Sequence, residues 1–257
     1  MPLEPDTILL TDRVAVVTGA AVGIGRAIAL AFARFGAHVA LCDRDADNLA
    51  ATADEVAGLQ RMALSAVLDV REAERVRGFA EQVQARFGGV DILVNNAGGG
   101  FQAQFLAVTE KGQDALMREN FTQVSHCIRA FVPLMTRGRG SIINITSIEG
   151  HRAGPGFAIY SAMKAAVVSL TQSLALELGE RMIRVNCIAP DVIPTPGIGD
   201  VPVRTPLPRA GHVDDVAGAA LFLASDLSQF VTGSTIHVDG GNSAAGGWRR
   251  GPDGFTT

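Results

Sequence analysis

Tyrosine and lysine are almost absent from this chain. Its 257 residues contain one tyrosine, Tyr160, and two lysines, Lys111 and Lys164. Arginine therefore carries nearly all of the positive charge, yet the stretch "YSAMK" (160–164) sets the tyrosine four positions before a lysine. The scarcity of both residue types makes this pairing an informative feature of the sequence.

An excess of positive charge is also missing. The chain has 22 Lys and Arg residues against 26 Asp and Glu residues, which gives a net charge of -4 and a pI near 5.7. No broad cationic field results, so nucleic acid is not an expected partner.

Cysteine is scarce, and long hydrophobic runs are lacking. Cys42, Cys127 and Cys187 lie far apart in apolar stretches, which predicts buried thiols, no disulfide framework and no metal site. Glycines, Arg26 and Arg34 interrupt the apolar region 14–42, so no membrane span is expected there. The start, "MPLEPDTILLTDR", lacks the basic flank and apolar core of a signal peptide. A cytoplasmic location is the expectation.

What the chain does have is an alternation of short β-rich runs with longer helical patterns, in a composition that is 47% hydrophobic. This alternation predicts βαβ units and an α/β fold, a single-domain (1–257) Rossmann-type doubly wound parallel sheet of about seven strands with helices on both faces. The predicted strands lie near 13–18, 37–42, 61–68, 90–95, 140–146, 183–189 and 234–239. The predicted helices lie near 23–35, 45–57, 71–87, 109–136, 157–179 and 213–224.

Three segments bear on access and assembly. Residues 190–212 contain six prolines and three glycines, which predicts a loop long enough to act as a lid. Residues 242–257 are predicted to form a mostly irregular tail, with Trp248 near a neighbouring subunit. The helix 157–179 is apolar on more than one face and needs cover beyond the sheet, so we expect a homotetramer or a homodimer.

A glycine-rich turn follows the first predicted strand. In "TGAAVGIG" (18–25), Gly19, Gly23 and Gly25 separate a β-branched run from an amphipathic helix. Such glycines permit a tight turn, let the backbone approach a pyrophosphate and leave N–H groups free at the helix N-terminus. The strand before and the helix after this turn predict dinucleotide binding.

An acidic residue ends the next strand, "VALCDRD" (39–45). Asp43 stands about twenty residues after the glycines, where a carboxylate accepts hydrogen bonds from a ribose. The alternative role is a cap for the following helix, which Asp45 is equally able to fill. A carboxylate at this place repels the 2′-phosphate of NADP, so NAD is the expected cofactor and NADP the less favoured one. Arg44 is the counter-argument, because a guanidinium can clamp that phosphate.

Polar residues and glycines also end the third and fourth strands. Asp69 and Val70 close the third, and "VNNAGGG" (94–100) closes the fourth. The carboxyl ends of parallel strands are where such sheets bind ligands. Asn95 has a compatible structural alternative, in which its side chain pins neighbouring strands.

The Tyr160–Lys164 pair has acid/base potential. Residues four apart share one face of a helix, and a nearby ammonium favours the phenolate of a tyrosine. The pair is a plausible general base for an alcohol or general acid for a carbonyl; the alternative is a packed aromatic ring beside a solvated lysine. The strand "SIINITS" (141–147) delivers Ser147, whose hydroxyl either binds the reacting oxygen or serves a turn.

Together these motifs resemble the short-chain dehydrogenase/reductase family, from about Arg13 to Gly241. The resemblance rests on "TGAAVGIG", "NNAG" (95–98), Ser147, "YSAMK", "RVNCIAP" (184–190) and "FVTGSTIHVDGG" (230–241). It implies that Tyr160 is the acid/base, that Ser147 orients the substrate oxygen, and that Lys164 lowers the tyrosine pKa and holds the nicotinamide ribose. It also implies that Asn120, in "RENFTQ", supports a water-mediated proton relay.

The resemblance further implies a set of cofactor contacts. They are Gly19, Val22, Gly23, Ile24, Gly25, Asp43, Arg44, Asp69, Val70, Asn96, Ala97, Gly98, Tyr160, Lys164, Pro190, Ile193 and Thr195. One departure stands out: Asp191 follows Pro190 where the family usually has glycine. Because aspartate tolerates a left-handed backbone better than most residues, we expect the turn to survive in that conformation.

The predicted function is transfer of a hydride between NAD(H) and a secondary alcohol or ketone. Phe101, Phe105, Ile148 and Phe157 fall in segments expected to line the pocket, which favours an apolar steroid-like, terpenoid or acyl substrate. His151 and Arg152 either bind an anionic group or face water.

Alternative functions are a 3-oxoacyl thioester reductase of the same family and a non-catalytic dinucleotide sensor. Enoyl reductases of the superfamily space tyrosine and lysine more widely, and extended sugar-nucleotide epimerases use a different glycine spacing and a longer chain.

Overall fold

One parallel sheet organises the molecule. The computed structural model describes residues 3–196, 198, 203, 205–247, 249–251 and 254–256. The strands of the sheet are β1 (Val14–Thr18), β2 (His38–Asp43), β3 (Ala63–Val67), β4 (Ile92–Asn95), β5 (Gly140–Ile145), β6 (Ile183–Pro190) and β7 (Thr235–Val238). Their spatial order is β3-β2-β1-β4-β5-β6-β7, and every neighbouring pair is parallel. The order reverses between β1 and β4, so the predicted doubly wound Rossmann-type fold is confirmed.

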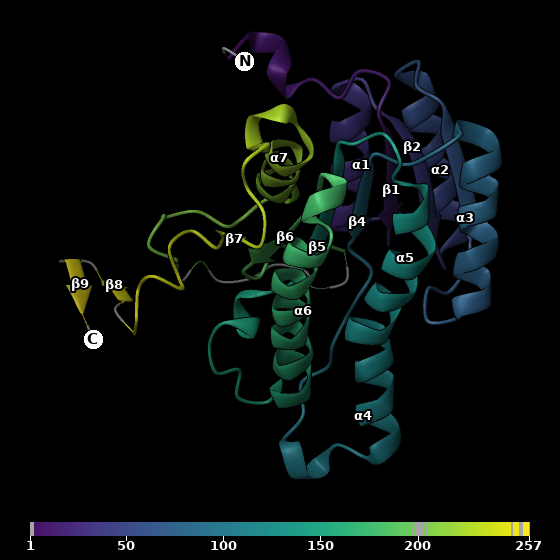
Figure 1. Cartoon of the computed structure of the whole chain (residues 1–257). Helices are drawn as coiled ribbons and strands as arrows, with labels where there is room; N and C mark the ends of the chain where they lie inside the picture. Colours follow the sequence, from purple (N-terminus) through teal and green to yellow (C-terminus); the bar gives the residue numbers. More distant parts are fainter. Residues whose placement is uncertain are drawn as a thin grey trace.

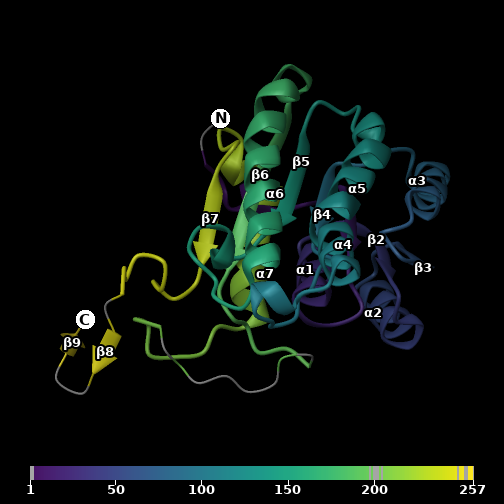
Figure 2. The same ribbon diagram turned by 90° about the horizontal axis from the view of Figure 1, so that it is seen from below.

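Helices cover both faces of this sheet (Figures 1 and 2). One layer holds α1 (Gly23–Arg34), α2 (Ala46–Gly58) and α7 (Val213–Ala224), and the other holds α3 (Ala73–Phe87), α5 (Gln123–Phe131) and α6 (Ala158–Glu177). α4 (Glu110–Met117) leads into α5. The short helical turns are η1 (Pro5–Ile8), η2 (Phe105–Ala107), η3 (Arg118–Thr122), η4 (Val132–Leu134), η5 (Ile148–Gly150), η6 (Gly179–Arg181) and η7 (Asp226–Ser228).

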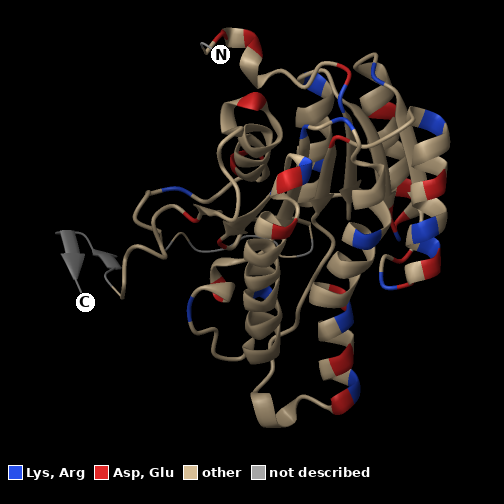
Figure 3. Cartoon of the chain, viewed as in Figure 1, with Lys and Arg blue, Asp and Glu red and all other residues tan. Residues whose placement is uncertain are grey.

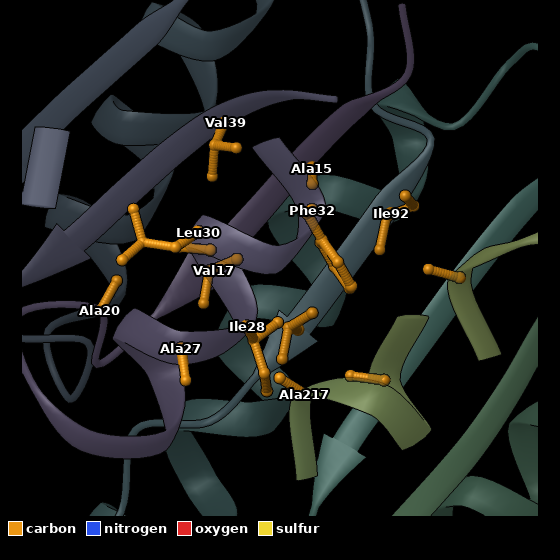
Figure 4. Close-up of a cluster of buried hydrophobic side chains, with 14 of the residues drawn as sticks. Ala15, Val17, Ala20, Ala27, Ile28, Leu30, Phe32, Val39, Ile92 and Ala217 are labelled. Atoms are coloured by element: carbon orange, nitrogen blue, oxygen red, sulfur yellow. The ribbon is translucent and has the colours of Figure 1, made fainter. Parts of the chain in front are cut away.

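The core lies on both sides of the sheet because successive strand residues point to opposite faces. In β1, Ala15 and Val17 pack toward α1, α2 and α7, whereas Val14 and Val16 pack toward α3, α5 and α6. Figure 4 shows the first of these clusters, in which Phe32 of α1 lies over the strands. All five residues of β1 are buried, as expected for a strand covered on two faces.

The predicted helix over 109–136 is wrong as one continuous element. The structure has α4, a π-helical turn η3, α5 and the 3-10 turn η4 in its place. Within η3 the side-chain amide of Asn120 donates to Leu116 O at 3.0 Å, and the Gln123 N–H bonds five residues back to Arg118 O. A side chain that occupies a backbone acceptor widens the helix locally, and such π turns often mark functional sites.

The C-terminal segment differs in part from the irregular tail predicted from the sequence. The C-terminal tail is not wholly irregular, because β8 (Arg249–Gly251) and β9 (Gly254–Thr256) form an antiparallel pair. This pair lies away from the main sheet in both views (Figures 1 and 2). Trp248 lies outside the described residues.

The loop predicted over 190–212 follows β6. Between Asp191 and His212 the described residues form no helix or strand, as predicted for a loop.

Helix α6 is the one described helix that is long and apolar enough to cross a membrane by length and composition, with a hydropathy of 1.2. In the fold it packs along β6 and beside α4 and η3. Only 28% of the most apolar 18-residue stretch of this helix is buried, however, and Leu176 is 83% exposed. In Figure 3 the visible side of α6 carries little charge compared with α3 and α4. One apolar face of this helix is therefore uncovered in the single chain.

Candidate active site

A cleft opens at the carboxyl ends of the strands, with about 2130 Å³ of space, part of it open to solvent. It brings together the predicted cofactor residues from five strand ends and the predicted catalytic residues Ser147, Tyr160 and Lys164. Two predicted residues, Gly25 and Asn120, do not line the cleft and lie behind its wall. Gly99, Gly100 and Glu149 fall in segments that were expected to line the pocket. Other lining residues were not predicted, among them Cys42, Leu68, Arg71, Glu119, Ile145 and Thr146.

The glycine-rich turn is shaped for close backbone approach. Gly19 and Gly23 have φ angles of 64° and 61°, which disfavour any residue with a side chain. A Cβ atom at Gly25 would lie 2.1 Å from Gly19 O, so only glycine lets α1 start this close to the turn. Val22, at the N-cap of α1, makes no side-chain hydrogen bond to the first helical turn. The backbone N–H groups there are thus left for an anion.

Asn96 and Thr18 hold this turn in place. The Asn96 side-chain amide donates to Thr18 O at 3.0 Å and to Gly19 O at 2.9 Å. The Thr18 hydroxyl accepts hydrogen bonds from the backbone N–H groups of Asn96 and Ala97. The end of β4 therefore braces the end of β1. Asn96, which was predicted to contact the cofactor, lines the cleft, and its amide group also stabilises the turn that would bind the cofactor.

The Asp43 carboxylate is fixed by backbone donors at the end of β2. Ala21 N donates to its Oδ2 at 3.0 Å, while Arg44 N and Asp45 N donate to its Oδ1 at 2.6 and 3.1 Å. Asp45 caps α2 by accepting from Asn48 N, so the alternative role of Asp43 as the helix cap is wrong. Asp43 is held rigidly in the cleft wall, with oxygen lone pairs left for a ribose.

Two ion pairs flank the same end of the cleft. Arg71 donates to both carboxylate oxygens of Asp69, and this hydrogen bonding holds the Asp69 pKa below its usual value. Arg44 Nη2 lies 3.5 Å from Glu119 Oε1, which links the end of β2 to η3 across the cleft. Sequence reasoning missed Arg71 and Glu119. Arg71 lies only two residues after its partner Asp69, whereas the pair of Glu119 with Arg44 joins segments far apart in the sequence and does not follow from any local pattern.

Tyr160 and Ser147 stand together at the other end of the cleft. Burial raises the Tyr160 pKa above its ordinary value, a hydrogen bond from Ser147 lowers it, and the nearby Glu149 charge raises it. The Ser147 hydroxyl also accepts from Glu149 N at 3.2 Å. The net shift is upward, and Lys164 is not among its main causes in this structure. Desolvation of the phenol outweighs the favourable contacts.

Lys164 explains part of that result by its own position. Its side chain is 5% exposed, its Nζ donates to Ile145 O at 3.0 Å, and Nζ lies 5.5 Å from the centre of the Tyr160 ring. The amino group thus lies over the ring rather than at the phenol oxygen. Burial lowers the Lys164 pKa from 10.5 to about 8, so the amino group stays mostly charged at neutral pH and loses its proton in mildly alkaline solution.

Glycines at the end of β4 let the catalytic helix approach. A Cβ atom at Gly98 would lie 3.1 Å from Asn120 Oδ1 and 3.3 Å from Lys164 Nζ, and one at Gly100 would lie 3.0 Å from Tyr160 Cδ2. Asn120 is buried, and its amide donates to Gly99 O at 2.7 Å. Asn120, Lys164 and Tyr160 therefore converge on "AGGG" (97–100), which joins the nucleotide and acid/base parts of the cleft.

The buried polar residues beneath the cleft are structural. Asn95 donates to Asn144 Oδ1 at 2.8 Å and Asn144 donates to Thr171 at 2.8 Å, which ties β4, β5 and α6 together. The structural role considered for Asn95 is thus confirmed. The three cysteines are buried free thiols, as predicted. Within the described ranges, no group of three or more His, Cys, Asp or Glu side chains is placed to hold a metal ion.

Asp191 preserves its turn in a different way from the one expected. It is not among the described residues with positive φ, so its backbone is not left-handed. Its N–H donates to Val238 O at 3.1 Å, and its carboxylate accepts from Val192 N and from the Asn242 side chain at 2.7 Å each. Side-chain hydrogen bonds from two segments replace the conformational freedom of a glycine.

Aromatic and aliphatic groups dominate the side of the cleft beyond Tyr160. A small adjoining hollow is lined by Phe101, Phe105, Val108, Leu116 and Phe157, among others. Phe101 and Phe105 are 47% and 60% exposed. Such surfaces bind apolar ligand groups.

The two basic residues considered for an anionic group have other partners. Arg152 forms hydrogen bonds with Glu149 Oε1 at 2.7 and 3.1 Å, so its charge is already neutralised. The His151 ring stands edge-on to His237 at 4.6 Å, and burial lowers the His151 pKa. These contacts do not favour recognition of an anionic group by this pair.

Comparison with known proteins agrees with this arrangement. A family model described as Enoyl-(Acyl carrier protein) reductase matches residues 19–243. The chain is 39% identical over 241 residues to the 3-oxoacyl-[acyl-carrier-protein] reductase FabG of Thermotoga maritima, covering 90% of this chain and 98% of that protein. It is 38% identical over 247 residues to the (2S)-[(R)-hydroxy(phenyl)methyl]succinyl-CoA dehydrogenase subunit BbsD of Thauera aromatica, covering 93% and 99%.

A solved structure extends the likeness to three dimensions. The 7 alpha-hydroxysteroid dehydrogenase complexed with NADH and 7-oxo glycochenodeoxycholic acid matches with a TM-score of 0.89 and 33% identity, covering 93% of this chain and 98% of that one. The fold and the cleft define a nucleotide-dependent oxidoreductase architecture. The chain belongs to the short-chain dehydrogenase/reductase family.

Proposed function

We propose that this protein is an NAD-dependent oxidoreductase that interconverts a secondary alcohol and a ketone on an apolar substrate. The observation that carries the proposal is the convergence of Ser147, Tyr160 and Lys164 at one end of a cleft whose other end is a glycine-shaped turn. A nucleotide-binding protein without catalysis has no need of that convergence. Steady-state turnover of any alcohol or ketone would exclude such a sensing role.

The residues present fit a dinucleotide. The uncapped N-terminus of α1, with Gly19 and Gly23 in the positive-φ conformations that favour glycine, would hold the pyrophosphate through backbone N–H groups. Asp43 would accept hydrogen bonds from the adenosine ribose. Val70 and Asp69 would border the adenine, and Ile193 and Thr195 the carboxamide. The carboxyl end of β6 brings Pro190 to the same cleft.

The acid/base step falls to Tyr160. When bound, the nicotinamide supplies the hydride acceptor or donor. As a phenolate the Tyr160 side chain would take the proton from the alcohol, and as a phenol it would give its proton to the ketone oxygen, while the Ser147 hydroxyl holds that oxygen. Lys164, with a pKa near 8, is able to exchange a proton close to neutral pH. Asn120, which lies in the π turn η3, would support a water-mediated proton relay from this lysine.

The proposed cofactor preference rests on Asp43. Its carboxylate is held by three backbone N–H groups and cannot swing away from a bound nucleotide. A 2′-phosphate placed against it would bring like charges together. NAD is therefore proposed as the favoured cofactor and NADP as the disfavoured one. The structural neighbour with bound NADH agrees with this choice.

The proposed substrate has an apolar ring or acyl group beside the reacting carbon. The exposed side chains of Phe101 and Phe105 and the half-buried Phe157 would contact it. Two more specific candidates are a hydroxysteroid, as for the structural neighbour, and a 3-oxoacyl thioester, as for the Thermotoga relative. The spacing of four between Tyr160 and Lys164 is the reason for preferring carbonyl over enoyl reduction.

The decisive experiment is a substrate panel. Hydroxysteroids, 3-hydroxyacyl thioesters and polyols would be assayed with NAD+ and NADP+, and the corresponding ketones with the reduced cofactors. We expect the highest kcat/KM with NAD+ and an apolar secondary alcohol. Higher kcat/KM for 3-hydroxyacyl thioesters would favour the second candidate. Absence of turnover with every class would overturn the proposed function.

We also propose that a second copy of the chain covers the exposed apolar face of α6. Most of its exposed residues are small or apolar, with Gln172 and Glu177 as exceptions, and Leu176 is 83% exposed. Together with the adjoining α4 and α5, this face would form an isologous interface in a dimer or tetramer. A stable monomer in light scattering at micromolar concentration would contradict it. A cytoplasmic location remains a proposal consistent with three reduced, buried cysteines.

A further inference from the structure

Glu119 occupies an unusual position above the nucleotide cleft. It belongs to the π turn η3, next to Asn120, and its side chain is 29% exposed. Its Oε1 lies 3.5 Å from Arg44 Nη2, and a Cβ atom at Gly99 would lie 3.6 Å from the same oxygen. The carboxylate therefore reaches from η3 over the end of β4 toward the end of β2.

Five charged side chains surround this end of the cleft. They are Asp43, Arg44, Asp69, Arg71 and Glu119. Arg71 is bound through two of its nitrogens to Asp69, and the nearby Glu119 charge contributes to raising the Arg71 pKa. Three carboxylates face two guanidinium groups, which leaves one net negative charge where the adenosine ribose would lie. Such a field opposes an additional phosphate.

Arg44 is the one described arginine of the cleft that is available to bind a 2′-phosphate. Arg71 is committed to Asp69, whereas the Arg44 side chain is 59% exposed and its pair with Glu119 is long. A half-exposed pair of this length is weak, so Glu119 competes with a phosphate rather than excluding it outright. The position of Arg44 alone would allow either cofactor.

We propose that Glu119 is a cofactor-specificity residue. It holds the Arg44 guanidinium on the η3 side of the cleft and adds the negative charge that disfavours a 2′-phosphate. This inference rests on the proposed use of a nicotinamide dinucleotide, and it assigns part of the preference for NAD to a residue outside the glycine-rich turn and outside β2. Asp43 and Glu119 act from opposite walls of the same subsite.

The test is the affinity of the full-length protein for NAD+ and NADP+, measured by isothermal titration calorimetry. Glu119→Gln keeps the shape of the side chain and removes its charge. We expect NADP+ to bind about tenfold more tightly to this variant, the scale of one charge–charge interaction at a partly solvated site, with NAD+ affinity changed less than about twofold. The double variant Glu119→Gln/Arg44→Ala should lose that gain.

Glu74→Gln is the matched control. Glu74 pairs with Arg77 on the exposed side of α3, so this variant removes the same charge outside the cleft. It should leave both affinities unchanged. If Glu74→Gln tightened NADP+ binding as much as Glu119→Gln, the effect would be one of net charge and the inference would be overturned.

Two further outcomes separate this inference from the proposed function. A parent protein that binds NADP+ more tightly than NAD+ would refute the proposed preference itself. A parent that prefers NAD+, with the same ratio in Glu119→Gln, would leave that preference standing and refute the role of Glu119. Equal weakening of both nucleotides in Glu119→Gln would show a general structural role and would also refute it.

Discussion

The two ends of the cleft are built in different ways. At the nucleotide end, backbone N–H groups, glycines and strand termini set the geometry, and Asp43 is fixed by three backbone donors. At the substrate end, the surface consists of phenylalanine side chains on loops and short helical turns, several of them exposed. The first end is shaped by the backbone and the second by interchangeable side chains.

This difference separates what the family shares from what distinguishes its members. The glycine-rich turn between β1 and α1 tolerates few substitutions. A side chain introduced there would have to adopt a positive φ or would come within 3 Å of a neighbouring atom. A wall of side chains can change with little effect on the fold, so it can adapt to different substrates. Tyr160 and Lys164 lie where the two ends meet.

The largest expected effect concerns that meeting point. Tyr160→Phe should lower kcat by at least about a hundredfold, the usual scale for a lost general acid or base. Binding of NAD+ should change less than about twofold, because the phenol oxygen is not part of the glycine-rich turn that would hold the pyrophosphate. Steady-state kinetics and calorimetric titration check the two halves of this expectation. Near-normal turnover with a good substrate would refute the proposed role.

The second prediction strains the backbone-built end. In Gly25→Ala the new Cβ atom would lie 2.1 Å from Gly19 O, so the turn and α1 must separate. We expect NAD+ affinity to fall more than about tenfold and the free energy of unfolding to fall by about 1–3 kcal/mol. Calorimetry and urea denaturation measure these changes.

Gly78→Ala provides the control for that variant. Gly78 lies within α3, and a Cβ atom added there would meet nothing within 4 Å, so alanine should stabilise the protein by about 0.5–1 kcal/mol through helix propensity. Nucleotide affinity should not change. Equal behaviour of the two glycine variants would mean that the close contact at Gly25 is unimportant.

The third prediction uses the pH dependence of stability at Lys164. Its pKa is about 8 in the folded protein and about 10.5 when unfolded, so the unfolded chain binds more protons between these values. Raising the pH through this window should therefore stabilise the parent relative to Lys164→Met. At about 1.4 kcal/mol per unit of pKa, the gain approaches roughly 3 kcal/mol.

Urea denaturation of parent and variant at pH 7, 8.5 and 10 measures this difference directly. Contributions from other titrating groups are common to both proteins and cancel to first order. The loss of the hydrogen bond to Ile145 O gives an offset that does not depend on pH. A difference in the free energy of unfolding that stays constant across the three pH values would contradict a lowered pKa of the buried Lys164.

The smallest expected effect lies at the side-chain-built end. Phe105→Ala removes a 60% exposed ring from the apolar wall and should raise KM for an apolar substrate about five- to tenfold, equivalent to about 1–1.4 kcal/mol of lost contact. NAD+ affinity should not change. Phe230→Ala, which removes a fully exposed ring elsewhere, is the control. An unchanged KM in Phe105→Ala would place the substrate elsewhere.

Sequence reasoning was reliable where local pattern decides structure. The strand and helix periodicities predicted the seven parallel strands, and the glycine spacing located the turn between β1 and α1. The same reasoning predicted one helix over 109–136, because periodicity does not reveal that the Asn120 amide occupies a backbone acceptor. It also expected a left-handed Asp191, because Asn242 is distant in sequence and its hydrogen bond was not foreseeable.

By itself, the amino-acid sequence determined the order of the strands and helices, the glycine-rich turn and the choice of Tyr160, Lys164, Ser147 and Asp43 as site candidates. These features depend on residue types at fixed spacing along one segment. Only the tertiary structure decided that burial raises the Tyr160 pKa, that Lys164 lies over the ring, and that Glu119 reaches Arg44. Desolvation and ion pairing depend on which segments pack together, and such contacts join residues that the linear sequence keeps far apart.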